Sequence, residues 1–332
     1  MVNYFPEKLL EYIRDGLVEQ EQFGFIVRCS SKTCLFKLGD DSNYPFYLRS
    51  CAKPLQGSLI IDFKLDTFLN MSLKEIALCC SSHSGEPCHV SIVKNLLKKT
   101  GIDKSDLKCG IDKPLSRNEC KKLIISGSQE NILQNNCSGK HAMMLAICKK
   151  NGWDCKTYDE KEHPLQIAVR DKIYELCELN EDYAITKDGC GVPIYAMPLE
   201  NMAKGYLNLF LNKKYSKIRD AFLQNPYLIS GENRLDNAIM NANENLIAKS
   251  GASGIFIVVN LKEKEALVVK VLDDNMKARA ICVIEALKQL GWLDDKMLQH
   301  ELIKKHNKRD ILTHHNEKVG EIKTNIHLQA GR

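Results

Sequence analysis

The sequence has no long hydrophobic run. Its apolar stretches are all short, and Ile255–Val259, for example, suits a buried strand, whereas a membrane-spanning helix needs about 20 consecutive apolar residues. Residues 1–21 alternate charged and apolar side chains and lack the apolar core and cleavage site of a secretion signal. These absences favour a cytoplasmic protein that has no membrane partner.

The chain also has little excess charge of one sign. Among its 332 residues, 47 Lys and Arg stand against 42 Asp and Glu, which gives a net charge of +5. No basic run is interleaved with aromatic residues, as the groove of a nucleic-acid-binding protein requires. Nucleic acid is therefore not an expected partner. An apolar content of 44% excludes disordered and collagen-like classes.

Linkers and internal repeats are missing as well. No low-complexity segment and no break in composition divides the chain. We therefore expect residues 1–332 to form a single domain, which is long enough to bury a substantial core.

Cysteine, in contrast, is abundant, with 14 residues. Disulfide frameworks belong to short secreted chains that cannot build a core, and this chain is neither short nor visibly secreted. We therefore expect reduced thiols, most of them small core side chains.

Hydrophobic periodicity predicts both strands and helices. Alternation over Leu17–Phe36, with a turn at Ser30–Lys32, predicts a hairpin. Gly101 is expected to end a helix as its C′ residue. The predicted helices are 73–80, 90–100, 140–150, 164–180, 215–223, 234–249 and 276–290, the further strands are 254–259, 266–271 and 319–328, and a solvated helix and turn are expected over 299–315. This order predicts an α+β fold whose terminal strands share one antiparallel sheet.

The first motif with chemical potential is Arg49–Pro54. Ser50 and Lys53 are three residues apart, so at the start of a helix they lie on one face, and Pro54 is tolerated only in a first turn. A serine becomes a nucleophile if a neutral lysine takes its proton, and the Arg49 cation favours such neutrality. The alternative is an N-cap serine beside a surface lysine.

Two further motifs lie at the ends of predicted helices, one after the helix that ends at Cys80 and one at the start of a later helix. Ser81–Glu86 gathers polar side chains around a glycine, which is typical of an active-site loop or of a simple turn. In Asn135–His141, Cys137 and Lys140 are three apart at a predicted helix N-terminus, where the dipole favours a thiolate. Cys137 is thus a candidate nucleophile or metal ligand.

The fourth motif, Asp188–Pro193, has two glycines around Cys190. Such a backbone can approach another group closely, as a ligand-bearing loop must. Cys137 and Cys190 are candidates to share one ion, although their spacing matches no standard zinc pattern.

Together and in this order, these motifs resemble the Rhizobium-type L-asparaginases. The likeness also includes Gly16–Glu19, His163–Gln166 and Val319–Ile322, and it spans roughly residues 14–325. It implies a fold like the serine β-lactamases and penicillin-binding proteins, an antiparallel sheet with helices. It further implies a homodimer that hydrolyses L-asparagine to L-aspartate and ammonia.

The resemblance also implies roles for individual residues. Ser50 corresponds to the nucleophile and Lys53 to its base, while Ser82 corresponds to a second serine paired with a lysine on a late strand, for which Lys270 is the expected match. Cys137, Lys140 and Cys190 correspond to ligands of a zinc ion (Zn2+) with water as the fourth. Arg49, His83 and Asp188 are the expected substrate-binding residues.

Three other interpretations remain open at this level. The first is a serine amidohydrolase of the same fold that acts on a different amide. The second is a non-catalytic zinc-binding protein. The third is a hydrolase that uses Cys137 as its nucleophile. The Ser50, Lys53 and Ser82 side chains argue against the second, since a binding module has no need of two Ser/Lys pairs.

Overall fold

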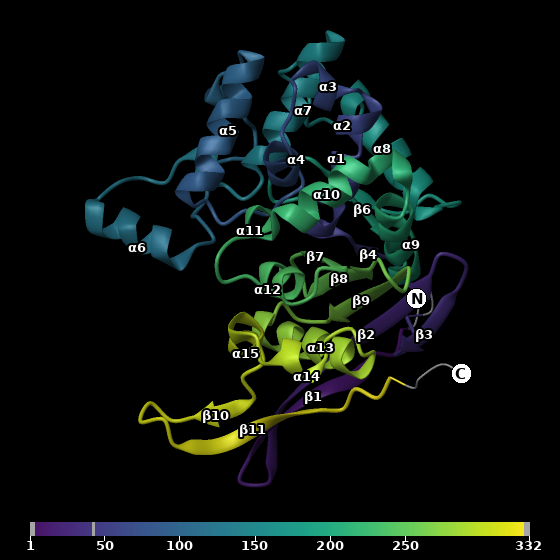
Figure 1. The fold of residues 1–332 in the computed structure, drawn as a ribbon, viewed down its shortest axis with the longest axis vertical. Coiled ribbons are helices and arrows are strands. Elements are labelled where there is room, and N and C mark those ends of the chain that lie inside the picture. The colour runs from purple at the N-terminus through teal and green to yellow at the C-terminus, as the bar shows by residue number, and fades with distance from the viewer. Residues whose placement is uncertain (1–3, 42–43, 329–332) are drawn as a thin grey trace.

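A computed structural model describes residues 4–41 and 44–328 (Figure 1). Its main feature is an eight-stranded antiparallel sheet in the order β10-β11-β1-β2-β9-β8-β7, with β3 paired to β2. The strands are β1 Glu7–Arg14, β2 Leu17–Ser30, β3 Cys34–Leu38, β7 Leu246–Ser250, β8 Ile255–Asn260, β9 Glu265–Val271, β10 Asp310–Leu312 and β11 Lys318–Thr324.

A smaller sheet lies between the main sheet and the helices above it. It has the order β4-β6-β5, and its strands are β4 Phe46–Tyr47, β5 Ile185–Lys187 and β6 Pro193–Met197. Because β4 directly precedes the Arg49–Pro54 motif and β6 follows the Asp188–Pro193 motif, this sheet brings both motifs to one place.

Most helices gather in a lobe above the main sheet, whereas α13, α14 and α15 lie beside the sheet, at the height between β9 and β11 in the view (Figure 1). The helices are α1 Ala52–Gly57, α2 Leu59–Asp62, α3 Leu65–Phe68, α4 Leu73–Cys79, α5 Pro87–Thr100, α6 Arg117–Ser126, α7 Ser138–Asn151, α8 Pro164–Cys177, α9 Leu199–Phe210, α10 Ser216–Gln224, α11 Pro226–Ile229, α12 Leu235–Ala242, α13 Met276–Gln289, α14 Asp295–Leu298 and α15 Glu301–His306.

Helices cover the central strands of the main sheet. Helix α9 packs against β2, β8 and β9, while α13 packs against β1, β8 and β9. Every residue of β8 is buried, and its continuous apolar sequence is what a strand covered on both faces requires. The edge strand β7 is also buried along its whole length, because α12 and the short 3₁₀ turn at Arg49–Cys51 pack against it.

The hairpin and the joining of the two ends of the chain are confirmed. Strand β2 pairs with β3, and β1 pairs with β11 with Tyr12 opposite Ile322. Gly101 ends α5 with φ +61°, the left-handed conformation expected of a C′ glycine. The α+β class with an antiparallel sheet is therefore confirmed.

Two predicted segments are wrong in part. The helix expected over 234–249 ends at Ala242, and the chain then enters β7. A short segment that is buried on both faces has no periodicity that distinguishes strand from helix, so the sequence pattern does not show that Leu246–Ser250 is a strand. Similarly, the segment 299–315 contains α15 but also a short strand, β10, which pairs with β11.

Helix length and polarity bear on the membrane question. Within residues 4–41 and 44–328, no helix combines the length and the apolar character needed to cross a bilayer.

Candidate active site

The candidate site begins where strand β4 passes into α1. Arg49 has φ 48°, a left-handed conformation that is uncommon for a residue with a side chain. This conformation turns the chain into the 3₁₀ turn that carries Ser50 and leads directly into α1. Ser50 is half-buried, and among the described residues its hydroxyl has no hydrogen-bond partner.

Arg49 itself is held by two contacts. Its Nε donates to Asp188 Oδ1 at 2.8 Å, and its Nη1 donates to Ser253 Oγ at 2.8 Å. Burial opposes ionisation of Asp188, but the charges of Arg49 and Lys140 hold the pKa of that carboxyl below its ordinary value. Two of the three predicted substrate-binding residues are therefore an ion pair beside Ser50.

Ser82 follows α4 and lies between two lysines. Lys53 Nζ donates to Ser82 Oγ at 3.0 Å, and Lys249 Nζ donates to the same oxygen at 2.9 Å. All three side chains are buried, with exposed fractions of 4% for Ser82, 1% for Lys53 and 0% for Lys249. Because both lone pairs of the hydroxyl accept, its own proton is free to be donated.

Lys53 has a second anchor at the start of α7. Its Nζ also donates to the backbone oxygen of Asn136 at 3.0 Å and to Asn136 Oδ1 at 3.1 Å. The lysine thereby connects the Ser82 loop to the Asn135–His141 motif. Lys53 does not form a hydrogen bond with Ser50, which lies three residues before it.

The pairing of Ser82 with Lys270 was a wrong expectation, because Lys249 occupies that position. Lys270 Nζ donates instead to the backbone oxygens of Ser253 at 2.6 Å and Val271 at 2.9 Å, and it lies 5.5 Å from the centre of the Phe46 ring. Lys249 stands on the edge strand β7, in the segment that the sequence had assigned to a helix.

A sequence signal for Lys249 does exist. Lys249-Ser250-Gly251 has the form of the K-T-G motif that accompanies S-x-x-K in β-lactamases and penicillin-binding proteins, with Ser in place of Thr. This motif indicates a catalytic lysine only when it lies on a strand beside the S-x-x-K helix. Because the sequence pattern predicts a helix over 234–249, the motif is not recognisable from the sequence alone.

Burial adjusts the proton affinity of Lys249. Desolvation lowers its pKa to about 8, and the Lys53 charge adds to this effect while Asp236 opposes it. Asp236 is itself buried: burial opposes its ionisation, but Lys249 and Arg234 hold the pKa of its carboxyl below the ordinary value. Asp236 also accepts from the backbone N–H of Ser250 at 2.6 Å, which fixes this part of β7.

His83 supports the structure around the site through hydrogen bonds within the protein and does not line the site itself. It is fully buried, and its Nδ1 accepts from the backbone N–H of Gly85 at 3.2 Å. Its Nε2 lies 2.9 Å from Ser138 Oγ, whose proton is donated to Leu133 O, so Nε2 carries the hydrogen. Both ring nitrogens are thus in use inside the protein, and the expected contact between His83 and substrate has no free nitrogen to make it.

The sequence-predicted metal ligands lie together. Cys137 and Lys140 are at the start of α7, and Cys190 is in the turn between β5 and β6. Lys140 Nζ lies 2.9 Å from Cys190 Sγ, and a hydrogen bond from the Cys190 thiol, helped by the Lys53 and Lys140 charges, holds the pKa of Cys137 well below its ordinary value. All three side chains are buried.

A polar relay ends at the same cluster. The backbone N–H of Lys108 donates to Tyr158 Oη at 2.8 Å, and Tyr158 Oη lies 2.6 Å from His141 Nδ1. The other ring nitrogen of His141, Nε2, is buried without an oxygen or nitrogen partner among the described residues and contacts the thiol of Cys190. Sequence reasoning missed both His141 and Tyr158.

A second group of metal-ligating side chains occurs at the start of α5. Ligand atoms of Glu86, Cys88 and His89 lie within 4.8 Å of one another. However, His89 Nδ1 accepts from the backbone N–H of Glu86, and Tyr227 donates to the Glu86 carboxylate. These bonds give the group a capping role without a metal.

Comparison with known families identifies the chain. The profile of the L-asparaginase II family matches residues 10–324. The chain belongs to the L-asparaginase II family. It is accordingly an amidohydrolase, and the Rhizobium-type resemblance of its motifs is confirmed.

Comparisons with individual proteins provide less information than the family profile. No curated protein matches the chain significantly. Among solved structures, the chain is similar to a β-lactamase from Mycobacterium bovis, with 17% identity, a TM-score of 0.42 and coverage of 86% of this chain and 95% of the other. It is also similar to a β-lactamase-like protein from Bacteroides dorei, with 11% identity, a TM-score of 0.42 and coverage of 75% and 85%. Similarity at this level carries no information about the residues of the site.

Proposed function

We propose that this asparaginase-family chain hydrolyses L-asparagine to L-aspartate and ammonia, with Ser50 as the nucleophile and Lys53, Ser82 and Lys249 as its proton-transfer chain. The observation that carries the proposal is the single hydroxyl of Ser82 between two buried lysine amines, at 3.0 and 2.9 Å. Such an arrangement moves a proton between two bases through one hydroxyl, which an interaction surface does not need.

Ser50 is the better nucleophile of the two serines. A nucleophile has to reach a substrate carbonyl, and Ser50 is half-buried with a hydroxyl that has no partner among the described residues. Ser82 is almost fully buried and is bonded on both sides. Attack by Ser50 Oγ on the amide carbon forms an aspartyl ester and releases ammonia, and water then hydrolyses the ester.

Activation of Ser50 requires one neutral lysine in the chain. Lys249 loses its proton most readily, because burial lowers its pKa to about 8. When Lys249 is neutral, Ser82 gives it a proton and takes one from Lys53. Lys53 is then neutral and accepts the proton of Ser50, and the same chain returns a proton to the departing nitrogen.

The Arg49–Asp188 ion pair suits the zwitterionic end of the substrate. Arg49 uses Nε and one Nη1 hydrogen in the bonds described, which leaves further N–H groups of its planar fork for a carboxylate. Asp188 accepts Arg49 through Oδ1, and its low pKa keeps it charged to receive an ammonium group. We assign these two residues to the α-carboxylate and α-amino groups of asparagine.

The donor set of Cys137, Lys140 and Cys190 fits a zinc ion. A low-pKa thiolate, a second thiol and an amine lie within one buried cluster, and the buried Nε2 of His141 contacts the Cys190 thiol beside it. When bound there, zinc would supply a positive charge near the Arg49–Asp188 ion pair. His141 and Tyr158 orient Cys190 through the hydrogen-bond relay. A homodimeric assembly and a cytoplasmic location remain predictions of the sequence.

The proposal is tested by ammonia release from asparagine and from glutamine, measured together with metal analysis of the same purified protein. We expect release from asparagine, near one zinc ion per chain, and loss of release in Ser50→Ala. A protein with full zinc occupancy that releases ammonia from neither amide would instead be a binding protein. Activity that persists in Ser50→Ala but is lost in a zinc-retaining Cys137→Ser would favour a cysteine nucleophile.

A further inference from the structure

Two thiols face each other at one end of the main sheet, where the Ser30–Lys32 turn joins β2 to β3. Cys29 and Cys34 are directly opposite partners in this antiparallel pair, with an irregularity in the register beside them. Side chains of directly opposite residues lie on the same face, with Cβ atoms about 4.5–5.5 Å apart. A disulfide requires Cβ atoms about 3.5–4.5 Å apart, so only a small movement separates this pair from a bond.

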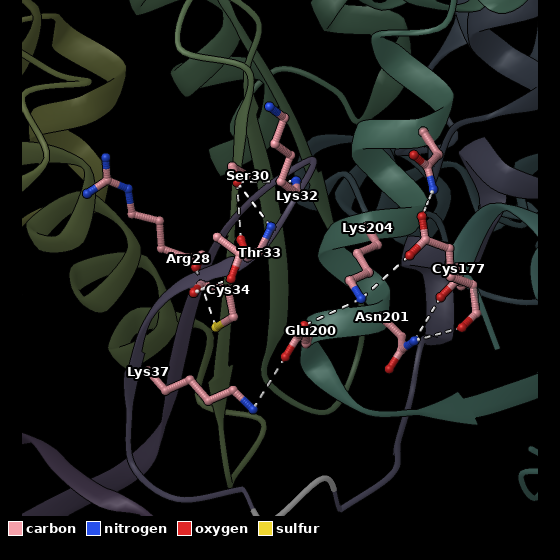
Figure 2. A network of polar contacts seen from close by, with 12 residues as sticks. Arg28, Ser30, Lys32, Thr33, Cys34, Lys37, Cys177, Glu200, Asn201 and Lys204 are labelled. Carbon is pink, nitrogen blue, oxygen red and sulfur yellow. Dashed lines mark hydrogen bonds and ion pairs between the residues drawn. The ribbon is translucent and has the colours of Figure 1, made fainter. Parts of the chain in front are cut away.

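The turn between these thiols is well defined. The backbone N–H of Ser30 donates to Thr33 O at 2.9 Å, and Ser30 Oγ accepts from the N–H of Lys32 and Thr33. Figure 2 shows this network, with the sulfur of Cys34 beside the backbone of Arg28. The local backbone therefore holds the two cysteines opposite each other and does not let them drift apart.

The two thiols differ in access and in charge. Cys29 is buried in the core, whereas Cys34 is half-buried. A hydrogen bond from the Cys29 thiol, aided by the Lys37 charge, lowers the pKa of Cys34 to about 7, although burial and Glu200 oppose this. The same interaction raises the pKa of Cys29. A half-buried thiol of lowered pKa next to a buried thiol is the arrangement of a peroxide-reactive cysteine beside a resolving cysteine.

We propose that Cys29 and Cys34 form a dithiol modification site that a hydroperoxide oxidises to a disulfide. In the first step, the Cys34 thiolate attacks the peroxide oxygen, the O–O bond breaks, and Cys34 sulfenic acid and an alkoxide or hydroxide ion form. In the second step, Cys29 sulfur attacks the Cys34 sulfur, and the sulfenic hydroxyl leaves as water with the Cys29 proton. The two sulfurs are oxidised by two electrons in total, and the hydroperoxide is reduced.

The chain provides an internal control in Cys88. Cys88 is the one exposed residue among the 14 cysteines. Partial burial of its thiol group and the nearby Glu86 carboxylate nevertheless raise the pKa of Cys88. If exposure alone decided reactivity, Cys88 would be oxidised before Cys34. Thiolate character, in contrast, favours Cys34.

Trypsin makes the disulfide directly detectable. Cleavage after Arg28, Lys32 and Lys37 releases Cys29–Lys32 and Thr33–Lys37 as separate peptides. They remain joined only if Cys29 and Cys34 are bonded. The experiment treats the reduced, metal-loaded full-length protein with increasing hydrogen peroxide, blocks the remaining thiols, digests the protein and quantifies the joined peptides and the Cys88 peptide by mass spectrometry.

We expect the joined peptides to form before Cys88 is modified, and the count of free thiols in denatured protein to fall from 14 to 12. In Cys29→Ser, Cys34 stops at the sulfenic acid, which dimedone captures. In Cys34→Ser, no joined peptide and no Cys29 adduct form. Joined peptides that are absent at peroxide concentrations that already modify Cys88 would overturn the proposal, as would a Cys29→Ser protein whose Cys34 reacts no faster than Cys88.

Discussion

At the scale of single residues, the proposed proton transfer depends on which lysine contacts Ser82. Burial lowers the pKa of both Lys249 and Lys270 to about 8, so proton affinity does not distinguish them. Their contacts do, because Lys249 donates to the Ser82 hydroxyl while Lys270 donates to two backbone oxygens. We therefore assign the proposed proton transfer to Lys249, whereas Lys270 holds the turn at Ser253 through its backbone contacts.

This difference predicts distinct pH profiles. Lys249 is protonated below its pKa of about 8 and neutral above it, and the proton chain needs the neutral form. In the wild-type protein, kcat/KM for asparagine should therefore rise with pH through about 8.

In Lys249→Met, activity should fall about 10²–10⁴-fold, the usual contribution of a positioned acid or base, and the rising limb should disappear. Lys270→Met is the matched control, since it removes a buried lysine of similar pKa and should keep the limb. A Lys249→Met enzyme that retains both the limb and the activity would remove Lys249 from the mechanism.

At the scale of secondary-structure elements, the site depends on close packing of α4 against α7. Gly139, in the first turn of α7, has no room for a side chain, because a Cβ there would lie 2.6 Å from the backbone oxygen of Leu78. This contact sets the distance between the loop that carries Ser82 and the helix start that carries Cys137 and Lys140. Gly189, next to Cys190, has open space around a Cβ.

Gly139→Ala and Gly189→Ala therefore form a matched pair. Overpacking in Gly139→Ala should destabilise the protein by about 1–3 kcal/mol and should lower activity, because the Ser82 loop and α7 are forced apart. Gly189→Ala should leave both nearly unchanged. Denaturant unfolding and the asparaginase assay measure the two effects, and equal stability of the two variants would show that the packing of Gly139 is not limiting.

The sequence pattern predicts an element well when one face of that element is exposed to solvent. The β2–β3 hairpin is predictable because apolar and polar residues alternate and a turn follows. Leu246–Ser250 is buried on both faces, so its pattern does not distinguish a strand from a helix. The position of Lys249 beside Ser82 is therefore not predictable from the sequence. Likewise, no spacing rule brings Cys190 to Lys140, because the turn between β5 and β6 and the start of α7 meet only through tertiary contacts such as the 2.9 Å approach of Lys140 Nζ to Cys190 Sγ.

At the scale of the whole molecule, the proposed metal ligands connect two parts of the fold. Cys137 and Lys140 belong to α7 in the helical lobe, whereas Cys190 belongs to the turn of the small sheet. A metal that binds all three stabilises the folded state relative to the unfolded chain, where these ligands are far apart. Zinc bound at the proposed site would thus have a structural effect on stability that can be measured separately from any effect on catalysis.

Removal of the metal by a chelator should accordingly lower the melting temperature of the wild-type protein, and added zinc should restore it. Zinc at a hundred times its Kd corresponds to about 2.7 kcal/mol of stabilisation. Cys190→Ala should not respond to zinc, while Cys88→Ala, which changes an exposed thiol outside the cluster, should respond like the wild type. A wild-type melting temperature that is independent of both chelator and zinc would contradict the site.

The central claim is that Ser50 is acylated during asparagine hydrolysis. The most direct measurement is rapid acid quenching of the enzyme during turnover, followed by mass spectrometry of the peptide that contains Ser50 and the peptide that contains Ser82. The account predicts an aspartyl ester on Ser50 that is absent in Ser50→Ala and accumulates less in Lys249→Met. An ester on Ser82 or on Cys137, with Ser50 unmodified, would contradict it.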